Sequence, residues 1–318
     1  MLVILAIGGL HSGAWGQGAS VVPAGREKVI IDTDIGDDVD DAFALALALS
    51  SDRLQILGVT TAWGNTTLRA RLVERLLQET GHAEIEVAAG PKTGGTAAAF
   101  TQAHWAEQFK QPAKRWPDAT EFILDAIRKN PREITLISLA PLSNMGALIE
   151  RDPVTFRKLK RVVMMGGSIR QGYGDLGYLP DQGPTAEYNL KMDIPAAKEL
   201  FASGVLIEMM PLDSTQLKLN EVLRGVLFSQ RSPMTKALNE LYQQWERFPN
   251  NVTPTLYDAM AVAVVLEPTL CPTTAMHVRI DDAGFTRMED GAANAAVCLH
   301  SNADQFFHFY LPQVLHAK

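Results

Sequence analysis

The chain has 318 residues, of which 47% are hydrophobic and 20% are charged, and its formal net charge is -7. This length and composition are typical of one large globular domain with a sizeable core. The acidic balance argues against a nucleic-acid partner, because contacts to phosphates need a basic surface. We therefore expect one domain over residues 26–318, with neither a nucleic acid nor a membrane as its partner.

Residues 1–20 have features of a secretory leader. Residues 2–10 form an apolar run that is too short to cross a bilayer, and Ala14-Trp15-Gly16 fits a small-x-small cleavage site. No Lys or Arg precedes Arg26, although such leaders usually begin with a positive charge. We expect a periplasmic or secreted protein, or a cytoplasmic one if this segment is not a true leader.

Two cysteines, Cys271 and Cys298, are present. Two cysteines make neither a disulfide framework nor a zinc site. They could pair with each other, but we expect two separate thiols in the apolar core.

Residues 28–49 combine a short β-branched run with a run rich in Ala and Leu. The first run predicts the end of a buried strand, and the second, residues 42–49, predicts a helix. Between them lie six aspartates within ten residues: Asp32, Asp34, Asp37, Asp38, Asp40 and Asp41. The aspartates therefore lie on a strand-to-helix turn, at the carboxyl end of a strand.

Strand-like and helix-like segments alternate further along the chain. The expected strands cover residues 54–61, 85–89, 134–139, 162–165 and 205–210. The expected helices cover residues 66–80, 119–129, a segment that Ser143 caps, and 194–203. Residues 101–117 are expected to be irregular, residues 217–268 mostly helical, and the end of the chain to hold short strands and a last helix near 305–315. This alternation predicts a Rossmann-like α/β fold, in which helices flank a mainly parallel central sheet.

Six carboxylates in a small volume repel one another unless a positive charge neutralises them. Oxygen-only ligation favours Ca²⁺ or Mg²⁺ over zinc, and no Cys or His is near in sequence. The alternative is a solvated acidic loop whose aspartates cap the following helix. That explanation suits one or two aspartates, and for six we favour a metal site.

The segment from Asp32 to Ala42 resembles the N-terminal signature of the inosine-uridine nucleoside hydrolase family, whose usual form is D-x-D-x-G-x-D-D-A. This chain has two extra residues between Gly36 and the final Asp-Asp-Ala. Alignment on Asp40 and Asp41 matches the helix that follows. A competing alignment counted from Gly36 uses Asp38 instead, and the sequence leaves both open.

Further segments resemble the same family. Residues 184–189 (PTAEYN) are similar to its A-E-F-N motif, which holds the ribose, and they follow a similar segment at residues 164–167. Asp258 matches a metal-binding aspartate that a histidine usually precedes, whereas Tyr257 occupies that preceding position here. Asp181 stands where the family has a ribose-binding asparagine.

The resemblance implies Ca²⁺-dependent hydrolysis of the N-glycosidic bond of ribonucleosides to ribose and free base, with a metal-bound water as the nucleophile. It also implies a nucleoside hydrolase fold and a role in purine or pyrimidine salvage, and a homo-oligomer is compatible with it. A Ca²⁺-dependent ribose- or nucleoside-binding protein without turnover is the alternative that Tyr257 and Asp181 leave open.

The implied site residues fall into three groups. The metal ligands are Asp34, Asp41, Asp258 and the backbone carbonyl of Leu139, and Asp32 and Asp38 would orient or replace ligands. The catalytic residues are Asp34, as general base, and Tyr257, as a weak acid or a stacking ring near the leaving base. Tyr188 is the alternative stacking ring. The substrate-binding residues are Asp40, Asn65, Met165, Asp181, Glu187 and Asn189.

Overall fold

A computed structural model describes residues 25–93, 100–110, 115–174, 182–249 and 251–316. The expected leader and Asp181 lie outside these described residues. Within them, no helix is both long and apolar enough to cross a membrane.

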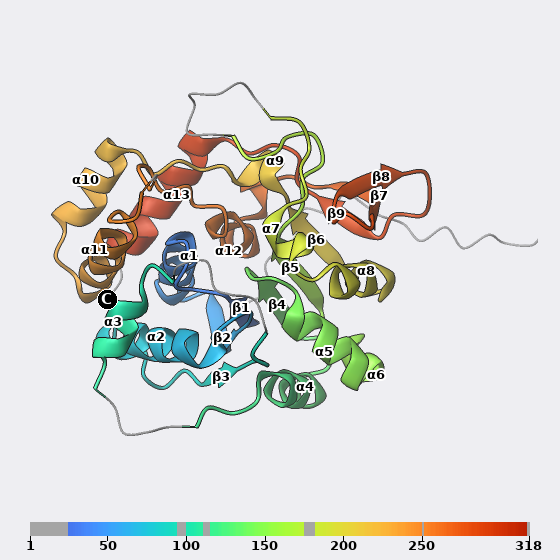
Figure 1. Cartoon of the computed structure of the whole chain (residues 1–318), viewed down its shortest axis with the longest axis horizontal. Coiled ribbons are helices and arrows are strands. Elements are labelled where there is room, and N and C mark those ends of the chain that lie inside the picture. The colour runs from blue at the N-terminus through green and yellow to red at the C-terminus, as the bar shows by residue number, and fades with distance from the viewer. Residues whose placement is uncertain (1–24, 94–99, 111–114, 175–181, 250, 317–318) are drawn as a thin grey trace, which may run out of the picture.

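Nine strands in the described part of the chain form one sheet in the order β3-β2-β1-β4-β5-β6-β9-β7-β8 (Figure 1). Their bounds are β1 Glu27–Thr33, β2 Leu54–Thr61, β3 Val87–Ala89, β4 Ile134–Ser138, β5 Arg161–Met165, β6 Ile207–Met210, β7 Thr274–Ile280, β8 Thr286–Glu289 and β9 Ala295–Val297. Strands β1 to β6 and β9 pair in parallel, and β7 pairs antiparallel with both β8 and β9. The predicted mainly parallel α/β fold is confirmed.

Helices cover both faces of this sheet (Figure 1). Their bounds are α1 Asp40–Leu49, α2 Thr66–Glu79, α3 Ala103–Gln108, α4 Ala119–Lys129, α5 Ser143–Arg151, α6 Pro153–Phe156, α7 Tyr188–Lys191, α8 Ile194–Ala202, α9 Leu212–Thr215, α10 Glu221–Ser229, α11 Pro233–Trp245, α12 Ala259–Leu266, η1 Pro268–Leu270 and α13 Ala303–Leu315.

Strand β1 shows why the predicted strands are almost continuously apolar. Val29 and Ile31 pack into a core with α1, α2, α11, α12 and α13, whereas Ile30 packs into a second core with α4, α5 and α8. Successive side chains of a strand point to opposite faces, so a strand between two helical layers needs apolar residues on both. Both faces of β1 are therefore buried.

The strand order places the aspartate turn at a switch point of the sheet. The chain runs from β1 outward to β2 and β3, and then returns to β4 on the other side of β1. In open α/β sheets the crevice beyond the carboxyl ends of the strands at such a point binds ligands. The segments that follow β1, β4 and β5 meet at this edge.

Two local predictions are wrong. Residues 103–108 form α3 where irregular chain was expected, because a helix of six residues carries too little periodicity to be recognised. Ser143 is the first residue of α5 rather than its cap, since Leu142 occupies the N-cap position and makes no side-chain capping bond.

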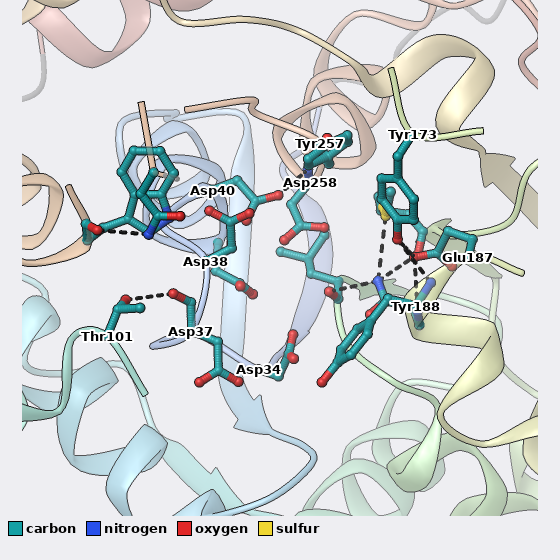
Figure 2. Close-up of a pocket in the computed structure, with 16 residues that line it drawn as sticks. Asp34, Asp37, Asp38, Asp40, Thr101, Tyr173, Glu187, Tyr188, Tyr257 and Asp258 are labelled. Carbon is teal, nitrogen blue, oxygen red and sulfur yellow. Dashed lines mark hydrogen bonds between the residues drawn. The ribbon is translucent and has the colours of Figure 1, made fainter. Parts of the chain in front are cut away.

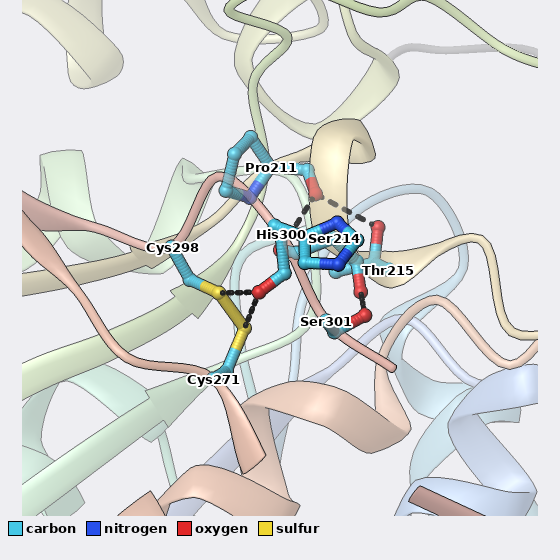
Figure 3. The surroundings of a disulfide bond; sticks show 7 residues. All are labelled: Pro211, Ser214, Thr215, Cys271, Cys298, His300 and Ser301. Carbon is cyan, nitrogen blue, oxygen red and sulfur yellow. Dashed lines mark hydrogen bonds between the residues drawn. A yellow bond between two sulfur atoms is a disulfide. The ribbon is translucent and has the colours of Figure 1, made fainter. Parts of the chain in front are cut away.

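The expectation of two separate core thiols is also wrong, because Cys271 and Cys298 form a disulfide (Figure 3). Cys271 follows η1 and Cys298 follows β9, with a sequence separation of 27 residues. Both residues are buried, as expected. Their proximity depends on how β7 and β9 pair, and local sequence carries no sign of that pairing.

Candidate active site

A cavity of about 390 Å³ opens at the carboxyl edge of the sheet (Figure 2). Its walls combine acidic and aromatic side chains from segments that are far apart in sequence. The lining residues are Asp34, Asp37, Asp38, Asp40, Asp41, Thr101, Leu139, Met165, Tyr173, Glu187, Tyr188, Asn189, Trp245, Asn251, Tyr257 and Asp258.

Three carboxylates converge at the cavity. Asp40 and Asp41 occupy the first turn of α1, and Asp258 precedes α12, a helix that packs against α1. One carboxylate oxygen from each lies within 4.8 Å of the others, and all three residues are buried. Asp258 occupies the N-cap position of α12, but its side chain makes no capping bond, so helix capping does not explain this aspartate.

Hydrogen bonds from neighbouring residues fix two of the three carboxylates, those of Asp40 and Asp41. The Thr33 hydroxyl donates a short hydrogen bond to Asp41, and the backbone N–H of Asp258 donates to Asp40 Oδ2 over 3.3 Å. Burial raises the pKa of Asp40, Asp41 and Asp258 well above the usual range, and the neighbouring carboxylates raise each pKa further. A cation among them would offset both effects.

The donor set fits a hard divalent cation. The converging side chains offer carboxylate oxygen alone, the ligand type that Ca²⁺ and Mg²⁺ prefer. Leu139, directly after β4, lines the same cavity, and its carbonyl accepts a hydrogen bond from Asn189 Nδ2 over 3.2 Å. This amide also donates to the Met165 carbonyl over 3.3 Å, so Asn189 links the ends of β4 and β5.

Asp34 also lines the cavity, below the three converging carboxylates in Figure 2. Burial raises the pKa of Asp34 to about 7, although Arg69 opposes this shift. Asp32 points away, into the protein, where its Oδ1 accepts from Thr60 Oγ1 and Asn144 Nδ2, both over 2.6 Å. Asp32 therefore joins β1, β2 and α5 beneath the turn.

Asp38 differs from Asp40 and Asp41. Its side chain is exposed at the cavity edge, and one carboxylate oxygen accepts from the backbone N–H of Val39 over 2.7 Å. The group of three converging carboxylates does not include it. The geometry therefore favours the alignment in which Asp40 and Asp41 match the family's Asp-Asp pair.

Glu187 lies on the opposite wall and accepts hydrogen bonds from backbone and side-chain groups. Its Oε2 accepts from the backbone N–H groups of Gly167 and Leu190, and its Oε1 accepts from the N–H of Asn189. The hydroxyl of Tyr173 donates to the same Oε1 over 3.4 Å. Glu187 thus ties the loop after β5 to the start of α7.

Tyr257 precedes Asp258 directly and lines the cavity. Its ring meets that of Tyr173 edge-on, with centroids 6.0 Å apart and an interplanar angle of 84°. Figure 2 shows Tyr257 above the labelled aspartates, Tyr173 to their right, and Tyr188 extending below toward Asp34. Aromatic surface of this kind suits a planar ring as ligand.

One predicted residue lies elsewhere. Asn65 is exposed and caps α2, where its Oδ1 accepts from the backbone N–H of Leu68 over 3.2 Å, and it is not among the residues that line the cavity.

Sequence reasoning missed five lining residues, namely Asp37, Thr101, Tyr173, Trp245 and Asn251. Asp37 belongs to the aspartate turn but was given no separate role, and Tyr173 falls in a loop rich in Gly and Tyr. The other three belong to no recognisable motif. Sequence reasoning also missed Arg69, a buried cation on α2 that contacts the aspartate turn. Because Arg69 and Asp37 are 32 positions apart in the chain, the sequence gives no sign that they are in contact.

Known proteins are similar to this chain in sequence and in fold. Uridine nucleosidase 1 of Arabidopsis thaliana is 29% identical over 287 residues, which cover 84% of this chain and 83% of that protein. The pyrimidine-specific ribonucleoside hydrolase RihA of Citrobacter koseri is 29% identical over 277 residues, or 80% of this chain and 84% of that protein. A solved plant nucleoside hydrolase, PpNRh1, has a TM-score of 0.79 at 23% identity and covers 91% of this chain and 99% of its own. The last likeness concerns the fold alone.

A family model described as inosine-uridine preferring nucleoside hydrolase matches residues 29–308, from the start of β1 into α13. The match includes the aspartate turn, the loop that carries Glu187, and Asp258. The chain therefore belongs to the inosine-uridine preferring nucleoside hydrolase family, whose members are hydrolases that act on N-glycosyl bonds.

Proposed function

We propose that this protein hydrolyses the N-glycosidic bond of ribonucleosides in a Ca²⁺-dependent reaction that yields ribose and a free base. The observation that carries the proposal is the convergence of Asp40, Asp41 and Asp258 at a cavity whose opposite wall holds Glu187 and Asn189. Carboxylates on one side and hydrogen-bonding groups on the other suit a cation and a sugar diol.

Asp41, Asp258, Asp34 and the carbonyl of Leu139 would hold the cation. When bound, Ca²⁺ would lower the pKa of a water and position that water beside the substrate. Asp34 takes a proton from the attacking water as general base. This role needs a carboxylate that faces the cavity, and Asp34 lines it.

Asp40, Glu187 and Asn189 hold the ribose hydroxyls. Glu187 and Asn189 act from a rigid frame, because Glu187 accepts three backbone N–H bonds and Asn189 is anchored to two carbonyls. Rigid groups that bind the distorted sugar more tightly than the ground-state sugar accelerate glycoside cleavage.

The leaving base lies against the aromatic wall of Tyr173, Tyr188 and Tyr257. Tyr257 donates a hydrogen bond to the base but transfers its proton reluctantly, since the phenol keeps its proton at neutral pH. One relative is named as a uridine nucleosidase and the other as a pyrimidine-specific ribonucleoside hydrolase, so uridine is the first substrate to test.

The decisive experiment is a panel of purine and pyrimidine nucleosides, with release of reducing sugar and free base followed with and without chelator. We expect uridine hydrolysis that stops on chelation and returns with Ca²⁺ better than with Zn²⁺. Nucleoside binding without sugar release would instead identify a binding protein. Full activity in a metal-free preparation would contradict the proposed role of the aspartates.

We also propose that the protein is exported. The disulfide between Cys271 and Cys298 supports this location, because such bonds persist in oxidising compartments. Fractionation of the native source and N-terminal sequencing test it. A mature chain that begins near Gln17 is expected, whereas one that begins at Met1 or Leu2 would count against export.

A further inference from the structure

A fully buried arginine, Arg69 on α2, lies beneath the aspartate turn, and its guanidinium contacts three backbone carbonyls. Nη1 donates to the carbonyls of Asp34, by a short bond, and of Ile35, over 3.0 Å. Nε donates to the carbonyl of Trp63 over 2.9 Å. The guanidinium therefore joins the turn after β1 to the turn after β2.

The same guanidinium is also an ion-pair partner. Nη2 lies 2.7 Å from Asp37 Oδ2, and the guanidinium carbon lies 5.1 Å from the centroid of the Phe100 ring. Four N–H bonds fan out from one planar group, an arrangement that the fork of arginine can make and the single ammonium of lysine cannot. A buried charge is tolerated when it is paired and hydrogen-bonded in this way.

We propose that Arg69 is a positioning residue for the hydrolytic reaction, an inference that rests on the proposed function. By holding the carbonyls of Asp34 and Ile35 toward α2, Arg69 fixes the backbone from which the Asp34 carboxylate enters the cavity. Its positive charge also lets the acidic turn pack against the core before any cation binds. Groups that orient metal ligands from behind typically contribute 10–100-fold to metal affinity or activity.

The test compares Arg69→Ala with Arg71→Ala, a matched change on the same helix. Arg71 donates to the carbonyl of Phe109 and does not line the cavity. Two quantities are measured for each variant: Ca²⁺ affinity by calorimetry, and kcat and KM for uridine. Both are repeated with millimolar guanidinium, which can enter the space left by the deleted side chain.

For Arg69→Ala we expect kcat and Ca²⁺ affinity to fall by about 10–100-fold with a smaller change in KM, and guanidinium to restore part of both. Arg71→Ala should match the wild type, with no response to guanidinium. Arg69→Lys should remain impaired, because an ammonium keeps the charge but loses the fork.

Three results would overturn the inference: unchanged kcat and Ca²⁺ affinity in Arg69→Ala, full activity in Arg69→Lys, or no guanidinium response in a folded Arg69→Ala. If Arg69→Ala does not fold, Arg69→Lys decides alone. If the wild type hydrolyses no nucleoside, the proposed function has failed, and Ca²⁺ affinity with its guanidinium response tests the position of Arg69 independently.

Discussion

Asp258 shows how a single residue of the site can lower the stability of the metal-free protein. Its pKa is raised well above the usual range by burial and then by Asp40 and Asp41. A charged carboxylate there destabilises the metal-free fold, and the same charge is needed to hold a cation.

We therefore expect opposite effects on stability and turnover in Asp258→Asn. Uridine turnover should fall by about 1000-fold or more, equivalent to about 4 kcal/mol of transition-state stabilisation. The metal-free variant should unfold at a higher temperature than the metal-free wild type at neutral pH. The fully exposed Asp282, changed to Asn, is the control that should alter neither quantity. Turnover near that of the wild type in Asp258→Asn would remove Asp258 from the site.

Tyr257 stands where the family usually has a histidine. Tyr257→Phe keeps the ring and its edge-on contact with Tyr173 but removes the hydroxyl. We expect kcat for inosine and uridine to fall by less than about 100-fold, the low end of the contribution of a general acid. Tyr257→Ala should lose more, because the ring contact disappears as well. Should Tyr257→Phe be as damaging as Asp34→Ala, the hydroxyl is the acid and the stacking role is wrong.

Among single residues, the sequence predicted site residues that belong to a local motif and missed those that only the fold brings together. Asp34, Asp40 and Asp41 are neighbours in one motif, and Glu187 and Asn189 in another, so both sets could be recognised. Arg69 and Asp37 are 32 positions apart, and no sequence pattern indicates that Arg69, the fourth residue of α2, points toward the aspartates. Asn65 is the opposite example, because it was predicted from a family position and in the structure it caps α2.

Among the elements, β1 and α1 were predictable because one is β-branched and the other is a run of strong helix formers. The short α3 lacked such a signal. The disulfide was missed for another reason. Its two cysteines meet only because β9 pairs with β7, which determines where the chain after η1 lies relative to the end of β9.

The disulfide should stabilise the antiparallel end of the sheet. Its two cysteines close a loop of 27 residues that contains β7, β8 and β9. Loop-closure entropy alone predicts that Cys271→Ser with Cys298→Ser lowers the free energy of unfolding by about 3.5 kcal/mol. Chemical denaturation of the oxidised protein and of the double variant measures the difference. Equal stability would show that β7, β8 and β9 are held by packing alone.

For the molecule as a whole, the buried carboxyls link stability to pH. Burial raises the pKa of Asp32 and of Asp34 to about 7. A group whose pKa is raised by folding contributes stability below its unfolded pKa of about 4, and this contribution is lost as the pH rises through the folded pKa.

We therefore expect the unfolding temperature of the metal-free protein to fall between about pH 4 and about pH 7. Saturating Ca²⁺ should reverse this trend, because the ion binds only deprotonated ligands and stabilises the folded state that it occupies. Calorimetric scans across this range, with chelator or with Ca²⁺, measure both slopes. A metal-free unfolding temperature that rises with pH would contradict the effect of burial on the carboxyls.

Helix α1 is buried at all ten of its positions, including the two aspartates of its first turn. Helix α1 therefore contributes both to the proposed metal site and to the hydrophobic core, and few substitutions in α1 can change one without disturbing the other. The aromatic wall is different, because Tyr173 and Tyr257 lie outside the regular helices and strands, and Tyr188 begins the four-residue helix α7. New base preferences should thus be easier to evolve, or to select from a library, by varying this wall than by varying α1.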